Sequence, residues 1–382
     1  MEKIEINKYI PFGVTLQDVL KHPALTGTKL KSLLRSRGIF VENSDDATTF
    51  PLLVSTILSP VEFEFIKENL KSKEDTQKII SKPLQWHDKE DLIKVIPDKI
   101  DLKTLLSLNN SRHKIISQTN FAPVDDNPNK VKMEFKCQTN NYNSSWYRSK
   151  NEFAGEVIVE KVEKDDKVYL KMIYTSDETQ HVADLAVKHL VEDFKKKNYT
   201  KPDSVIERIL YSSFTNEERV NFFLSLTADS DIFKFKRASD LEIGPDKSME
   251  LTAEIKQIMS GNVNDLKING ESLHENYLLN EKKNHQYIEI ASMEAIYDFS
   301  YHAAEGNCVV KCGFPGYFKK RMSNIEFSID VSTVNIDSEF STLNKDKVRL
   351  FLLQEFDKIK MTNYNTHKNK KINNAFMLTT TT

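Results

Sequence analysis

A glutamate, a lysine and two preceding aspartates form the first group in this sequence whose residue types could do chemistry. Asp125 or Asp126 comes first, and Glu134 and Lys136 follow. Metal-dependent cleavage of phosphodiesters needs carboxylates that hold a divalent ion and a lysine that stabilises the attacking hydroxide. Residues 131–137 alternate between apolar and polar types, which predicts a half-buried strand with Glu134 and Lys136 on one face. Because that face is the polar one, an ordinary solvent-facing strand is the competing interpretation.

Four basic residues near the start of the sequence form a second candidate: Lys29, Lys31, Arg35 and Arg37. They are interleaved with leucines at helical spacing, which predicts a short helix that stops at Gly38. With the leucines turned inward, the cationic groups could contact phosphates. A solvated basic helix face or a surface that docks a partner protein would show the same pattern.

Residues 25–58 resemble the SAP or helix-extended-helix module, a small nucleic-acid-binding unit. The resemblance rests on a helix, a glycine stop, an extended polar loop and a second helix at 52–58, about a tenth of the chain. It implies that Lys29, Lys31, Arg35 and Arg37 position phosphate. The chain departs from the module at Asn43-Ser44-Asp45-Asp46, where the module carries a glycine and a lysine and where acids would repel phosphate.

The order of an aspartate followed by Glu-x-Lys on a strand resembles the core of restriction-endonuclease-like nucleases. This second resemblance implies catalytic roles for Asp126, Glu134 and Lys136 around a metal ion. It stands as an alternative to a protein without catalytic activity.

Other chemistry has less support in the sequence. If Cys308 and Cys312 lie on one strand, their sulfurs are about 13 Å apart, too far to share a zinc ion, so we expect two buried free thiols. The stretch 146–148, Trp-Tyr-Arg, could stack on bases or anchor its own loop. We find no phosphate-cradling glycine-rich loop and no His-Glu-x-x-His, and we expect neither a cofactor nor a metal ion.

Composition limits the class of protein. The 382 residues carry a formal charge of -2, so any nucleic-acid contact must come from a local patch. No apolar run is long enough to span a bilayer and no signal peptide is recognisable, so we predict no membrane contact. Three cysteines in so long a chain argue against a disulfide framework and for the cytoplasm.

Hydrophobic periodicity predicts an α+β fold in several units. We expect a helical SAP-like module at 1–80, a central α+β domain at 81–240, a β-rich α+β domain at 241–360 closed by a helix, and a flexible basic tail at 361–382. Between residues 71 and 121 the patchy apolar spacing favours helical pieces joined by loops.

These patterns favour a cytoplasmic protein that binds nucleic acid or assembles a complex, with DNA or a protein as its partner. A pure interaction scaffold and a metal-dependent nuclease remain alternatives. Because the abundance of Asn, Lys and Ile is typical of an A/T-rich bacterial or viral genome, an accessory role in defence against foreign DNA is a further hypothesis.

Overall fold

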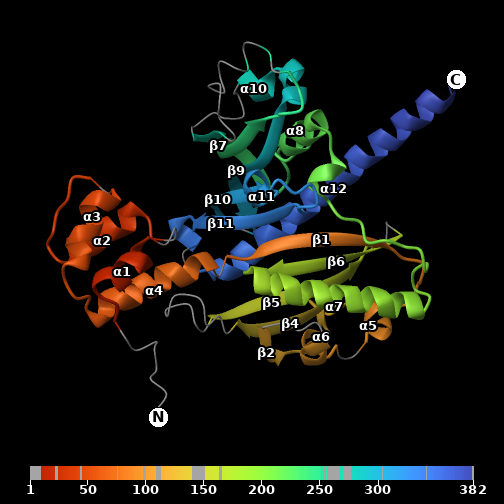
Figure 1. Ribbon diagram of the computed structural model, residues 1–382. Helices are drawn as coiled ribbons and strands as arrows, with labels where there is room; N and C mark the ends of the chain where they lie inside the picture. The colour runs from red at the N-terminus through yellow and green to blue at the C-terminus, as the bar shows by residue number, and fades with distance from the viewer. Residues whose placement is uncertain are drawn as a thin grey trace.

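The computed structural model describes residues 10–380 in part (Figure 1). The ranges outside the description are 22–24, 44, 75, 98–99, 109–112, 140–150, 163–165, 251, 253–254, 256–265, 270–276, 303 and 341. The aromatic and basic stretch 146–148 therefore lies outside the described residues.

Helices and strands alternate irregularly along the chain. The helical elements are α1 (Gly13–Leu20), α2 (Gly27–Ser36), α3 (Asp46–Val54), α4 (Pro60–Glu74), α5 (Leu92–Val95), α6 (Leu102–Leu108), α7 (Asp177–Lys196), η3 (Tyr211–Ser213), α8 (Asn216–Ser225), α10 (Tyr277–Asn280), η5 (Lys282–Tyr287), α11 (Tyr317–Lys320), η6 (Ser338–Phe340) and α12 (Lys345–Thr380). The strands are β1 (Lys78–Gln85), β2 (His113–Gln118), β3 (Ala122–Val124), β4 (Asn127–Thr139), β5 (Asn151–Lys161), β6 (Lys167–Tyr174), β7 (Phe233–Pro245), β8 (Leu266–Asn269), β9 (Ile288–Tyr301), β10 (Ala304–Gly313) and β11 (Ser328–Ile336). The α+β prediction is confirmed.

One antiparallel sheet joins all of these strands, in the order β2-β4-β5-β6-β1-β11-β10-β9-β7-β8, with β3 also on β4. The sheet has two halves that meet where β1 pairs with β11, and only Lys78–Asp330 and Ile79–Ile329 are in register there. Each half otherwise consists of long hairpins, such as β5 with β6 and β9 with β10.

Two helices cover the first half of the sheet on opposite faces (Figure 1). The amphipathic α7 packs on β5 and β6 and closes one core. The long α12 packs on β1 and β11, and with α8 it closes a second core that continues over the other half. Both faces of the central strands are therefore buried.

The central strand β1 corrects the prediction for residues 71–121. Six consecutive residues of β1, Ile79 to Leu84, are buried. A strand covered on both faces loses the apolar–polar alternation that reveals a half-buried strand, so its sequence showed no clear period.

The helices α1 to α4 form a separate unit with its own core, seen at the left of Figure 1. The core is built from leucines on α1, α2 and α3 together with Phe63 and Ile66 of α4. The start of α4 is fixed by a capping box, since Ser59 and Glu62 exchange hydrogen bonds.

The last helix is longer than predicted. The sequence predicts a helix that closes the domain at 241–360 and a flexible tail at 361–382, whereas α12 continues to Thr380. Its second half still contacts the body, because Lys368 lies 3.1 Å from Glu207. In the described ranges, no helix is both long and apolar enough to cross a membrane.

Candidate functional site

The helix α2 has the amphipathic character that the sequence predicts. Leu30, Leu33 and Leu34 are buried in the N-terminal core, and Arg35 on the opposite side is exposed. Lys31 donates a hydrogen bond of 2.7 Å to the backbone carbonyl of Glu42. The cations therefore lie on the outer side of α2, and at least Lys31 is held by a contact within the chain.

Arg37 has its guanidinium group engaged inside the N-terminal unit. Its Nε and Nη2 donate to the carboxylate of Glu62 at 2.5 and 2.9 Å, and Nη1 donates to Thr56. The hydrogen bond from Arg37 lowers the pKa of Glu62 to about 2, against the raising effect of partial burial. The Arg37 charge is therefore neutralised within the fold. Since Glu62 lies in the first turn of α4, this ion pair also joins the end of α2 to the start of α4.

The acidic stretch that departs from the SAP pattern has a structural role. Asp45 is the N-cap of α3, and its Oδ1 accepts a hydrogen bond of 2.7 Å from the Thr48 amide. Hydrogen bonds from Thr48 lower the pKa of Asp45, so the carboxylate stays charged. This cap fixes the start of α3 at Asp46. The helix ends at Val54, so it lies earlier in the chain than the helix predicted at 52–58.

Large apolar side chains are exposed on the same unit. Phe40, Ile57 and Val61 are each 79% exposed. Phe40 follows α2, and Arg37 contacts the stretch with Ile57 and Val61 through Thr56, the Ile57 carbonyl and Glu62. We call these three exposed residues the apolar patch and treat them together as a candidate interaction surface, because Arg37 links the segments that carry them.

The structure does not bring the three nuclease candidates together. Asp126 lies in the tight turn between β3 and β4, with φ of 55°. Glu134 lies eight residues further along, on β4, and no metal-holding group of three His, Cys, Asp or Glu side chains that includes these carboxylates occurs among the described residues. Glu134 and Lys136 do share the exposed face of β4, as expected. Glu134 there pairs with Lys132 at 2.5 Å.

The cysteine prediction is confirmed. Cys308 and Cys312 are free thiols buried on β10. Burial raises the pKa of Cys308 to about 12, so its thiol is protonated at neutral pH. Among the residues that the structure describes, no three His, Cys, Asp or Glu side chains are placed to hold a metal ion.

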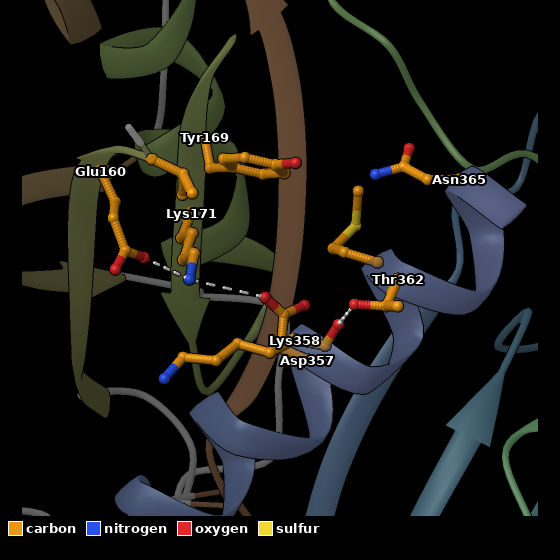
Figure 2. A pocket seen from close by; sticks show the side chains of 9 residues that line it. Glu160, Tyr169, Lys171, Asp357, Lys358, Thr362 and Asn365 are labelled. Atoms are coloured by element: carbon orange, nitrogen blue, oxygen red, sulfur yellow. Dashed lines mark hydrogen bonds and ion pairs between the residues drawn. The ribbon is translucent and has the colours of Figure 1, made fainter. Parts of the chain in front are cut away.

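A buried polar network joins α12 to the sheet, and sequence reasoning missed it. Asp357 is fully buried and accepts hydrogen bonds of 2.5 Å from Ser81 of β1 and from Lys360. Lys171 of β6 lies 4.0 Å from the Asp357 carboxylate and 2.6 Å from that of Glu160 on β5 (Figure 2). Burial alone would raise the pKa of Asp357, but Lys360 and Lys171 outweigh it and lower the pKa. The network therefore holds the buried Asp357 carboxylate and the half-buried Glu160 carboxylate in their charged form, since the pKa of each is lowered.

A second network lies on the opposite face of the same strand. Lys82, next to Ser81 in sequence, pairs with Asp184 of α7 at 2.5 Å and with Glu326 at 3.5 Å. Glu326 also accepts from Arg208. Neighbouring residues of a strand point to opposite faces, so β1 anchors a helix on each side.

These features define an α+β protein with a helical N-terminal unit that has an apolar patch and a basic helix. Residues 14–76, which span this unit, match the family described as the GAPS4b protein N-terminal domain, a domain associated with anti-phage defence. Neither the curated proteins nor the solved structures gave a match.

Proposed function

We propose that this chain is a non-catalytic component of an anti-phage defence complex and that its N-terminal unit binds a protein partner. The proposal combines the family similarity of residues 14–76 with the notable exposure of the apolar patch on that unit. Within the described ranges, most of the large apolar side chains that are at least 70% exposed belong to this unit.

The apolar patch is the observation that carries this proposal. Phe40, Ile57 and Val61 leave most of their surface in water, at a cost of about 25 cal/mol for each Å² of apolar area. A partner that covers the patch recovers that free energy. The neighbouring Arg37–Glu62 ion pair supplies a polar rim that is already organised.

Nucleic-acid binding through α2 is the second candidate. It is favoured by the absence of acidic residues in α2 and by the exposure of Arg35. Because Arg37 is paired with Glu62, we expect at most Lys29, Lys31 and Arg35 to meet phosphate.

The test uses the full chain, tagged and expressed from its own locus under phage challenge. Proteins that copurify with it are identified, purified and mixed with the chain to measure an affinity. The variant Phe40→Ser/Ile57→Ser/Val61→Ser should weaken that affinity by more than about a hundredfold, as expected when several apolar anchors are lost. It should also abolish protection in a plaque assay.

A matched control carries Val205→Ser, since Val205 is 78% exposed but lies outside the N-terminal unit. It should bind and protect like the parent. Equal binding by the patch variant and the parent would rule out the apolar patch as the interface. A patch variant that keeps its partner, combined with loss of DNA retention in Lys29→Ala/Lys31→Ala/Arg35→Ala, would favour the second candidate instead.

A further inference from the structure

A cavity of about 340 Å³ lies between the β5–β6 hairpin and α12 (Figure 2). Its volume falls in the range of small-molecule sites in proteins. The α12 side is lined by Lys358, Met361, Thr362 and Asn365, which recur at the spacing of one helix face. The sheet side is lined by Glu160, Val162, Tyr169 and Lys171, and Asp357 lies at the bottom.

The floor of this cavity is polar and places one ammonium between two carboxylates. The Lys171 side chain is 7% exposed, and its ammonium lies 2.6 Å from Glu160 but 4.0 Å from Asp357. A distance of 4.0 Å is too long for a hydrogen bond, so Lys171 retains donor capacity toward the cavity. The two carboxylates disfavour a bare anion at the floor, and a neutral group with hydrogen-bond acceptors fits there better.

The two sides of the cavity offer different chemistry. Tyr169 and Asn365 face each other from β6 and α12 (Figure 2), and Met361 of α12 also lines the cavity. Tyr169 and Met361 are 6% and 5% exposed, and the aromatic and thioether atoms that they leave at the cavity wall are of a kind that packs against a flat ring. The Asn365 carboxamide has no hydrogen-bonding partner among the described residues, and it can both donate and accept.

Lys358 stands near the mouth of the cavity. Its side chain is 52% exposed and pairs with Glu355 at 2.5 Å on the same helix. Exposed pairs of this kind contribute little, so Lys358 can exchange Glu355 for another anion.

We propose that this cavity binds a nucleobase-bearing small molecule, either a nucleoside or a nucleoside monophosphate. The ring lies against Tyr169 and Met361, and its polar edge meets the Asn365 carboxamide and the Lys171 ammonium. An asparagine carboxamide matches the paired donor and acceptor of a base edge. A ligand bound in this way contacts β6 and α12 at once and holds α12 to the sheet.

The test uses the purified full chain with adenosine, guanosine, cytidine, uridine and their 5′-monophosphates, each at about 1 mM. Calorimetry should detect binding of at least one of them, and that ligand should raise the melting temperature in proportion to its occupancy. Asn365→Ala should weaken the affinity about tenfold or more. Asn369→Ala, an exposed asparagine one turn further along α12, is the matched control and should bind like the parent.

Lys358→Ala distinguishes a nucleoside from a nucleoside monophosphate as the ligand. Weaker binding of the monophosphate alone identifies a nucleotide, whereas unchanged binding of the nucleoside and the monophosphate identifies a nucleoside. If none of the probes binds, or if Asn365→Ala binds as tightly as the parent, the proposal is overturned. Since the cavity is far from residues 14–76 in the sequence, this outcome is independent of the patch experiment.

Discussion

The substitution Asp357→Asn tests whether the buried network under α12 stabilises the fold. Asparagine keeps a group that can accept from Ser81, but it leaves the Lys360 ammonium buried without its counter-charge. Breaking a buried ion pair on one side costs about 3–5 kcal/mol. Unfolding 382 residues at about 2.1 cal/mol/K per residue gives an entropy near 0.8 kcal/mol/K. A loss of about 4 kcal/mol therefore lowers the melting temperature by about 5 °C.

The assay is thermal unfolding of the full chain followed by circular dichroism. Asp346→Asn is the control, because Asp346 forms an i,i+3 pair with Arg349 on the same helix but is 88% exposed. It should change the melting temperature by less than about 1 °C. The double variant Asp357→Leu/Lys360→Met removes both charges and should recover most of the loss. A melting temperature for Asp357→Asn within 1 °C of the parent, or a double variant less stable than the single one, would refute this account.

Further predictions concern pH, backbone packing and thiol reactivity. The pKa of Glu62 is about 2 in the folded chain and ordinarily 4.5, so its contact with Arg37 stabilises the fold above about pH 4.5 and is lost as the pH falls toward 2. Melting curves over this range should show a step, about 1 kcal/mol after solvent screening, that Glu62→Gln lacks. Gly306→Ala should destabilise the chain in urea unfolding by more than about 2 kcal/mol, because the added methyl overlaps a backbone carbonyl of β11; a smaller change would show that β10 and β11 can separate there. Cys308 and Cys312 should react with Ellman's reagent only after unfolding, since both thiols are buried; rapid reaction of the native protein would contradict that burial.

Local signals in the sequence were sufficient for part of the fold. The capping box of Thr215 and Glu218 starts α8, and it can be recognised in the sequence because both partners lie within one helical turn. The alternation of apolar and polar residues over 131–137 predicted which face of β4 is exposed, because only one face of that strand is buried. Periodicity failed at β1 because both faces of that strand are buried.

The candidate sites depend on contacts between distant residues, and these left no signal in the sequence. Arg37 has the same local pattern as Arg35, but its partner Glu62 is 25 residues away. Lys171 and Lys82 look like ordinary solvent-facing lysines of a strand, whereas both are buried against acids on helices. Only the pairing of β1 with β6 and the path of α12 bring these groups together.

The short connection between α4 and β1 has a mechanical consequence. Three residues, 75–77, separate the two elements, and three residues span at most about 10 Å. A pull on the helical unit therefore reaches β1 with little slack to absorb it. The start of β1 is also where the two halves of the sheet are paired, through Lys78–Asp330 and Ile79–Ile329. A force applied there therefore acts on this short β1–β11 pairing. Because α12 packs on both β1 and β11, we expect its side-chain contacts to resist such a force.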